Sequence, residues 1–213
     1  MEQHEKVTIA EYQLTAEAFR AGTWEHDVSQ NRDSLVRFLP RNPGKILDVG
    51  CGPGRDLVAF KQQGHTAIGL DATPAFVEMA KEVSGCEVWQ QSFLSLDLPG
   101  ETFDGIFANA SLIHVPRGDM VRVLEDLQRS LVSDGAIVMS MCRGDDEGYT
   151  IRPTGYRYVC AWEYETLARG VEAAGFEIID HYYRPLGVPL AAQSWLVIVA
   201  RKKASARRIL LTS

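Results

Sequence analysis

The sequence predicts an α/β fold, a three-layer sandwich in which helices cover both faces of a mostly parallel sheet. Two observations support this prediction. From Lys45 onward, short apolar runs alternate with amphipathic segments, and the first run leads into a glycine-rich turn that opens a helix. Such alternation is typical of parallel strands joined by crossover helices. The 213 residues, 46% of them hydrophobic, contain no Pro/Gly/Ser-rich linker and suit one domain over residues 1–213.

The N-terminal segment is predicted to be helical. Thr8 and Glu11 have the spacing of a capping box, which predicts a helix start there, and apolar residues then repeat at helical intervals as far as Gly22. A second helix start is expected at Asp27 or Ser29, ahead of another short apolar pattern.

The alternating part of the chain gives seven strands and four helices. The strands are predicted at residues 46–49, 66–70, 86–90, 103–109, 136–141, 176–183 and 194–200, and the helices near 55–63, 74–83, 120–131 and 162–174. Residues 142–160 break the pattern because they are polar, punctuated by glycine and rich in arginine and tyrosine. Loops of this length in a compact domain are usually functional, so we expect an active-site loop there.

Net charge and the cysteine pattern indicate which partners and which cellular location the protein has. The net charge of -6 argues against a nucleic acid substrate, and the one basic cluster is expected to be a solvated tail over residues 202–213. A polar N-terminus and the lack of a long apolar run predict a cytoplasmic protein with no membrane partner. The four cysteines form no CxxC pair and no zinc spacing, which predicts reduced thiols and no metal site.

The most informative motif is the run 48–54, in which glycine occupies three alternate positions. Glycine lets the backbone turn tightly and approach a ligand closely. A dinucleotide-binding turn would place its third glycine where Arg55 stands, so the spacing disfavours NAD. Asp71 ends the second strand about 20 residues beyond Gly50, where a carboxylate can accept both hydroxyls of a ribose.

With these residues the chain resembles the class I S-adenosylmethionine (SAM)-dependent methyltransferases of the small-molecule type, from about Lys45 to Arg201. The resemblance implies a seven-stranded sheet whose last strand is inserted antiparallel beside the sixth, and it implies SAM as the cofactor. Asp48 and the turn would hold the amino-acid portion and Asp71 the ribose. The implied cofactor-binding residues are Asp48, Gly50, Cys51, Gly52, Gly54, Asp71, Ala72, Ser92, Phe93, Asn109 and Tyr12.

The adenine position departs from the family pattern. Many relatives place an acidic residue there to accept a hydrogen bond from the exocyclic amine, and this chain has Ser92. A hydroxyl can accept but lacks the charge that strengthens the bond. Adenine recognition is therefore expected to depend on the Ser92-Phe93 backbone and the Phe93 ring. Asp97 is a second candidate, although its place beside Leu98-Pro99 suits a turn better.

In this family the loop after the fourth strand approaches the methyl group, and the segment before the first strand often folds over the cofactor. His114 is thus the candidate catalytic base, with a structural role as the alternative. Residues 1–44 are expected to form a helical lid, with Tyr12, His26 and Asp27 facing the site or serving only as surface and capping residues.

The acceptor is expected to be a small anionic metabolite, because arginine binds carboxylates through paired bonds. The candidate substrate-binding residues are His26, Arg143, Arg157 and Tyr158, with Arg152 and Arg184 close to the same segments. Alternatively, nearby acids such as Asp145, Asp146 and Glu147 neutralise these arginines. The predicted reaction is in-line methyl transfer to oxygen, nitrogen or sulfur by a monomer or homodimer. An RNA or protein methyltransferase, or a SAM-binding regulator without catalysis, is the alternative.

Overall fold

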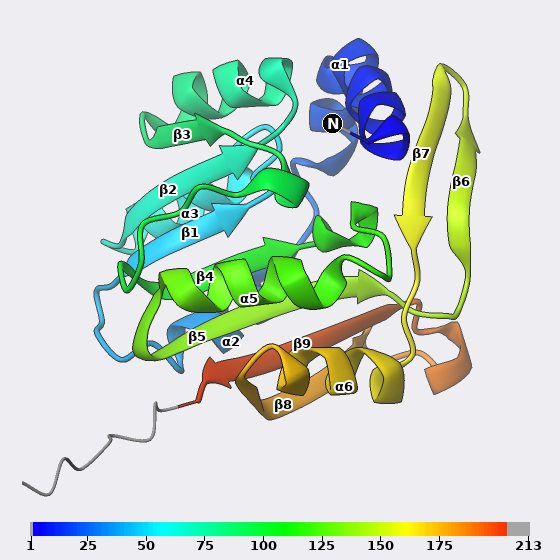
Figure 1. Ribbon diagram of the computed structural model, residues 1–213. Helices are drawn as coiled ribbons and strands as arrows, with labels where there is room; N and C mark the ends of the chain where they lie inside the picture. Colours follow the sequence, from blue (N-terminus) through cyan, green and yellow to red (C-terminus); the bar gives the residue numbers. More distant parts are fainter. Residues whose placement is uncertain (1, 204–213) are drawn as a thin grey trace, which may run out of the picture.

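A computed structural model describes residues 2–203, and within them the main sheet has seven strands in the order β3-β2-β1-β4-β5-β9-β8 (Figure 1). The strands are β1 (Lys45–Val49), β2 (Thr66–Asp71), β3 (Glu87–Gln90), β4 (Phe103–Asn109), β5 (Leu131–Cys142), β8 (Phe176–Arg184) and β9 (Trp195–Lys202). The strand β9 runs antiparallel to both of its neighbours, and the other pairs are parallel. The predicted fold class is confirmed.

Helices cover both faces of this sheet (Figure 1). The helices on these faces are α2 (Ser29–Val36), α3 (Arg55–Gln62), α4 (Pro74–Ser84), α5 (Met120–Ser130) and α6 (Tyr164–Ala173). The helix α1 (Gln3–Thr23) instead packs against α4 and residues 155–160. Side chains alternate between the two faces along each strand. In β1, Leu47 and Val49 join the apolar cluster beneath α5 and α6, whereas Ile46 joins the cluster beneath α2, α3 and α4.

The prediction of a loop over residues 142–160 is wrong, because most of this segment forms a β-hairpin. The strands β6 (Glu147–Arg152) and β7 (Gly155–Cys160) pair antiparallel, with Arg152 opposite Gly155 across a two-residue turn. The hairpin projects from the sheet, and β7 packs against α1 (Figure 1). The sequence signal was present as the period-2 pattern of Tyr149 and Ile151, but glycine and proline at the ends of the strands concealed it.

Three further expectations are corrected. Thr8 and Glu11 do not start a helix, since α1 begins at Gln3 and both lie inside it. The strand β5 begins at Leu131 rather than at residue 136, because the chain passes through a left-handed Asp134 (φ 59°) and stays extended. The basic tail does not begin at Lys202, which ends β9.

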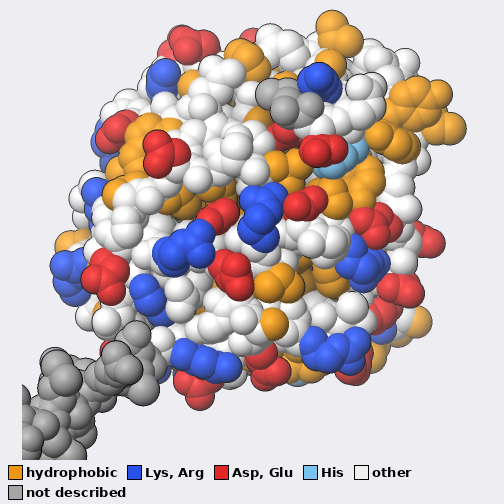
Figure 2. Space-filling view, in the orientation of Figure 1, with side chains coloured by type: hydrophobic (Ala, Val, Ile, Leu, Met, Phe, Trp, Pro, Cys, Tyr) orange, Lys and Arg blue, Asp and Glu red, His pale blue; other side chains and the backbone are white. Residues whose placement is uncertain are grey.

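Lys202 also donates from Nζ to the backbone oxygen of Leu131 at 2.7 Å. Arg207 and Arg208, the last basic residues of the expected tail, lie outside the described residues. On the face shown in Figure 2, Lys and Arg side chains are interspersed with Asp and Glu. Within residues 2–203, no helix combines the length and the apolar character that crossing a membrane requires.

Candidate functional site

A cavity of about 840 Å³ lies at the carboxyl ends of the parallel strands. Its walls come from the turn after β1, the residues after β2 and β4, one face of α1, and the hairpin. Open α/β sheets bind their ligands at this edge, where neighbouring strands end and their connections diverge. The site therefore lies where the sheet topology predicts.

The glycine turn is shaped by three residues with positive φ: Gly50 (73°), Gly52 (52°) and Gly54 (92°). A Cβ on Gly50 would come within 2.3 Å of the Ser111 side chain, and one on Gly54 within 2.8 Å of the Ala80 backbone. At Gly52 the nearest atom would be 3.9 Å away. Gly50 and Gly54 thus permit close packing, whereas Gly52 leaves its side of the cavity open.

Asp71 fixes this turn through both carboxylate oxygens. Its Oδ2 accepts from the Gly52 amide at 3.0 Å and its Oδ1 from the Thr73 amide at 2.8 Å. Burial raises the pKa of Asp71, and these backbone hydrogen bonds oppose that shift. Gly50, Cys51, Gly52, Asp71 and Ala72 all line the cavity as expected.

Asp48 and Gly54 do not line the cavity. Asp48 is only 3% exposed, and its Oδ2 has no hydrogen-bond partner among residues 2–203. Burial and then the neighbouring Asp56 raise the pKa of Asp48. The cofactor-binding role of Asp48 and Gly54 remains a prediction.

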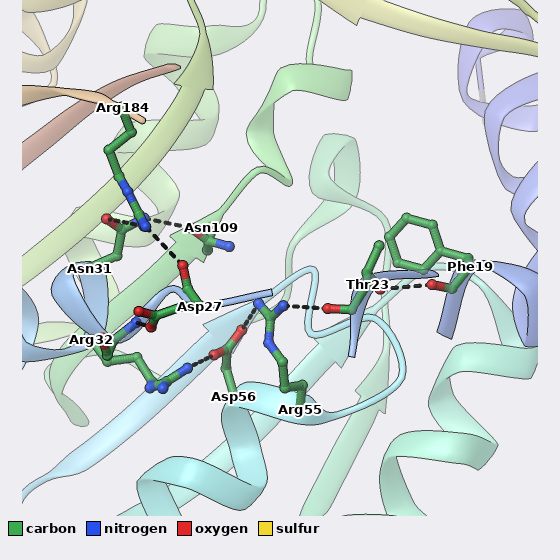
Figure 3. Close-up of polar contacts among 10 residues, drawn as sticks. Phe19, Thr23, Asp27, Asn31, Arg32, Arg55, Asp56, Asn109 and Arg184 are labelled. Atoms are coloured by element: carbon green, nitrogen blue, oxygen red, sulfur yellow. Dashed lines mark hydrogen bonds and ion pairs between the residues drawn. The ribbon is translucent and has the colours of Figure 1, made fainter. Parts of the chain in front are cut away.

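Arg55 and Asp56, the first residues of α3, do line the cavity, although the sequence analysis treated them only as a helix start. Asp56 accepts from Arg32 at 2.6 Å and from Arg55 at 2.7 Å (Figure 3). Arg55 also donates to the backbone oxygen of Thr23 at 2.8 Å. Charged residues directly after the glycine turn were the signal for this network.

A second polar network joins α2 to the ends of β4 and β8 (Figure 3). Asn31 donates to Asn109 Oδ1 at 2.7 Å, and Arg184 donates to Asn31 at 3.3 Å and to the backbone oxygen of Asp27 at 2.8 Å. Asn109, His26 and Asp27 line the cavity, and their binding roles remain predictions. Asn31 lines it too, and no motif in the sequence pointed to this residue.

His114 faces the same cavity and bonds through both ring nitrogens. Nδ1 lies 2.6 Å from the backbone oxygen of Tyr158, and Nε2 lies 3.0 Å from the Tyr12 hydroxyl. Because a carbonyl only accepts, we assign the imidazole proton to Nδ1, so that Tyr12 donates to Nε2. Burial lowers the pKa of His114 to about 4 and raises that of Tyr12 to about 12. The imidazole is therefore neutral at pH 7.

Arg157 is held by a buried acid on α1. Glu11, 3% exposed, accepts from Arg157 and also from Thr154 Oγ1 at 2.8 Å. Burial raises the pKa of Glu11, but the hydrogen bonds from Arg157 and Thr154 outweigh this effect and hold it below its usual range. Thr8 Oγ1 accepts from the Tyr158 amide at 2.9 Å and Thr15 Oγ1 from Arg157 at 3.5 Å, so three residues of α1 bond the hairpin.

The other predicted arginines differ in their surroundings. Arg152 lines the cavity, and its exposed side chain has no hydrogen-bond or ion-pair partner within residues 2–203. Arg143 does not line it. Its guanidinium bonds the backbone oxygen of Leu190 at 2.7 Å and lies 3.6 Å from the Glu163 carboxylate. Arg184 lines the cavity through the network in Figure 3.

Two of the three acids expected to neutralise the arginines of the hairpin pair with Arg117 instead. Asp145 and Glu147 lie 3.3 Å and 3.5 Å from Arg117, and the Tyr158 hydroxyl donates to Glu147. The side chain of Tyr158 is thus engaged outside the cavity, and its residue reaches the site through the carbonyl that holds His114. A substrate-binding role for the Tyr158 side chain remains a prediction without support from this geometry.

Ser92 and Phe93 follow β3, and the Phe93 ring lies close to Gly50 of the glycine turn. Phe93 lines the cavity beside Leu94, but Ser92 does not. Ser92 Oγ accepts from the Leu94 amide at 3.0 Å and donates to Glu5 Oε1 of α1. Glu5 does line the cavity, and the sequence analysis missed it because α1 and β3 are far apart in the chain. Asp97 lies in a turn closed by Gln91, whose Oε1 accepts from its amide at 2.9 Å.

Comparisons with known proteins agree with this geometry. Residues 46–135 match a family model described as a methyltransferase domain. Trans-aconitate 2-methyltransferase from Azoarcus sp. is 28% identical over 155 residues, which are 64% of this chain and 60% of that protein. Ubiquinone biosynthesis O-methyltransferase from Actinobacillus pleuropneumoniae is 26% identical over 65% of this chain and 52% of its own length. The chain thus spans less than two thirds of these relatives.

A solved structure with a similar fold is the 1,6-didemethyltoxoflavin-N1-methyltransferase of Burkholderia thailandensis. It has a TM-score of 0.73 and 25% sequence identity, and the match covers 96% of this chain and 92% of that one. That structure contains bound 1,6-didemethyltoxoflavin and S-adenosylhomocysteine.

Proposed function

We propose that this chain, which belongs to the class I SAM-dependent methyltransferases, transfers the methyl group of SAM to a small acceptor. In this proposal the methyl group passes to an oxygen, nitrogen or sulfur atom, and the acceptor bears a carboxylate. One observation supports this most directly. The cavity that contains the glycine turn and Asp71 extends to Arg152, a cation without an acidic partner within residues 2–203. A single cavity thus offers both a nucleoside site and, at the exposed Arg152, a place for an anion.

The residues present fit SAM. Asp71 is fixed by two backbone amides and retains acceptor capacity for ribose hydroxyls, while Gly52 leaves room for close approach. The amino-acid portion would lie near Arg55, Asp56 and Asn109, whose charges and amide suit an ammonium and a carboxylate. When bound, SAM supplies an electrophilic methyl group on a sulfonium. The protein then has to orient the acceptor and exclude water, which can supply much of the acceleration.

Arg152 and Arg184 are the proposed anchors of the acceptor carboxylate. Arg184 bonds only neutral oxygens, and the positive charge of Arg152 adds to the effect of burial in lowering the pKa of His114. Arg157 is compensated by Glu11 and Arg143 lies outside the cavity, so neither is needed for this role. The name of the Azoarcus relative refers to trans-aconitate, itself a carboxylate, which supports the proposal.

Proton removal is assigned to His114 with Tyr12. An acceptor that enters as an alcohol or protonated amine has to lose a proton during transfer. In this proposal that proton passes to the Tyr12 oxygen while the phenolic proton moves to Nε2 of His114. The resulting imidazolium keeps its Nδ1 hydrogen bond to the Tyr158 carbonyl. His26, an exposed residue of the cavity wall, is assigned a contact to the acceptor and no role as a base.

The alternatives receive less support. An RNA substrate would be expected to need a basic surface, and the face in Figure 2 mixes both signs of charge. A non-catalytic regulator would not require the bonded Tyr12 and His114 pair beside the cofactor cradle. The cytoplasmic location belongs to the proposal as well, and the four free cysteines of the structure are compatible with a reducing compartment.

The test is a transfer assay with methyl-labelled SAM. A panel of small carboxylic acids, their neutral amides, amines and RNA would be offered, and we expect labelling of carboxylates. Arg152→Gln should raise the Michaelis constant of the best acceptor roughly 10-fold through loss of a charged hydrogen bond, while SAM affinity holds. Arg143→Gln is the matched control and should leave both unchanged. Labelling of RNA alone, or equal kinetics in the Arg152 variant, would contradict the proposal.

A further inference from the structure

The adenine end of the cavity contains an acid that belongs to another part of the chain. Ser92 stands after β3, and its hydroxyl donates to Oε1 of Glu5 on α1. Glu5 lines the cavity together with Thr8, Ile9 and Tyr12. Residues spaced three and four apart share one face of a helix, so α1 presents this set of side chains to the site as a unit.

The second oxygen of Glu5 has no partner. Oε2 is buried and accepts no hydrogen bond from any residue in the range 2–203. An unsatisfied acceptor in a buried position destabilises the folded state, and does so more strongly when it is charged. Such an atom in the wall of a ligand cavity indicates that a donor on the ligand completes its bonding.

The surroundings of Glu5 define which donor fits. Ala72 follows Asp71 at the end of β2, and Phe93 and Leu94 follow β3, the neighbouring edge strand. Together with Ile9 they give apolar surfaces that suit a flat aromatic ring. With the ribose on Asp71, the base extends toward β3, and Glu5 is the acidic residue of the cavity wall that contacts this loop.

We infer that Glu5 recognises adenine, with its free Oε2 accepting a hydrogen bond from the exocyclic amine and its Oε1 held in place by Ser92. This inference rests on the proposed SAM-binding function. The charge absent from position 92 is thereby supplied from α1. Adenine is favoured over hypoxanthine because the amine donates to a carboxylate, whereas a carbonyl at the same position would face it with lone pairs.

The test compares two ligands, S-adenosylhomocysteine and S-inosylhomocysteine, by isothermal titration calorimetry. Unmodified protein should bind the adenosyl ligand more tightly. Glu5→Gln should weaken its binding roughly 10-fold, since a charged acceptor becomes neutral. The same change should strengthen or preserve binding of the inosyl ligand, because the Gln amide can donate to its carbonyl. Glu17→Gln removes an equal charge from an exposed position on α1 and should change neither affinity.

A rescue variant separates recognition from a docking role for α1. Glu5→Ala should lose the preference for the adenosyl ligand, and Glu5→Ala combined with Ser92→Asp should restore it by placing a carboxylate on the β3 side. Equal affinities in the unmodified and Glu5→Gln proteins, an equal loss for both ligands, or no rescue would overturn the inference. Failure of the unmodified protein to bind the adenosyl ligand would instead overturn the proposed function, and with it this assignment.

Discussion

At the scale of single residues, His114 is the side chain whose surroundings matter most. Burial, assisted by the charge of the nearby Arg157, lowers the pKa of His114 and keeps its ring neutral, whereas the hydrogen bond to the Tyr158 carbonyl opposes this shift. Because the charge of Arg152 also lowers the pKa of His114, an anion that enters the cavity and pairs with Arg152 should raise this pKa above its value of about 4 in the free protein. The anionic acceptor proposed above would therefore also activate its own base.

The lowered pKa gives a prediction about stability. The folded pKa of His114, about 4, lies below the unfolded value of about 6.5, so the unfolded chain binds the extra proton between these pH values. Stability should thus be retained above pH 6.5 and fall as the pH drops, with this residue contributing at most about 1.4 kcal/mol per pH unit.

Urea unfolding at pH 7 and pH 5 measures this effect. His114→Gln should shrink the difference in unfolding free energy between the two pH values, whatever its effect at either one. His65, whose pKa burial also lowers, would leave a remaining slope in the variant. An unchanged difference would show that His114 does not titrate as described.

The sequence predicted the site residues at the ends of strands, but not the contacts that α1 makes with them. Asp71, the glycine turn, Asn109 and His114 follow strands whose order can be deduced, so the sequence predicted their convergence. Tyr12 and His114 meet across 102 positions, and Glu5 and Ser92 across 87. Nothing local encodes how α1 docks, so the sequence left these pairs open.

At the scale of elements, the junction between α1 and the hairpin is the feature that no sequence pattern predicted. The exposed Tyr149 (52%), Ile151 (77%) and Tyr156 (51%) depart from the usual alternation of buried apolar and exposed polar residues. The hairpin depends instead on Glu11 and Thr8, which bond Arg157, Thr154 and Tyr158. Residues that resembled a capping box in fact hold another element in place.

We expect that breaking this junction would destabilise only the hairpin. Glu11→Gln would leave Arg157 without its buried partner and should destabilise the hairpin by roughly 3 kcal/mol, the lower end for a broken buried pair, since Arg157 also borders the cavity. Hydrogen exchange should accelerate in residues 147–160 while the central strands stay protected. Glu17→Gln, on the exposed side of α1, is the control. Unchanged exchange in the hairpin would mean that Glu11 does not anchor it.

At the scale of the whole molecule, the cavity is built by three parts of the fold, of which α1 and the hairpin also pack against each other. The sheet contributes the strand ends, α1 contributes one face, and the hairpin closes the remaining side. A ligand that spans this space contacts all three, so its binding energy is available only to the folded arrangement. The fold was predictable because the alternation of strands and helices fixes the sheet, whereas closure of the cavity depends on tertiary contacts.

Ligand-linked stability follows from this arrangement. S-adenosylhomocysteine at 100 times its dissociation constant should stabilise the protein by about 2.7 kcal/mol, which corresponds to a rise in Tm of roughly 5–10 °C for a chain of this size. Asp71→Asn replaces one acceptor by an amide that faces a backbone N–H, so the variant itself should be less stable. The informative quantity in thermal unfolding is therefore the ligand-induced rise, which should shrink in the variant at the same ligand concentration. NAD should produce no rise, because its pyrophosphate has no matching glycine turn here. A rise of equal size in Asp71→Asn, or one produced by NAD, would place the ribose elsewhere and remove the basis for assigning the two ends of the cavity.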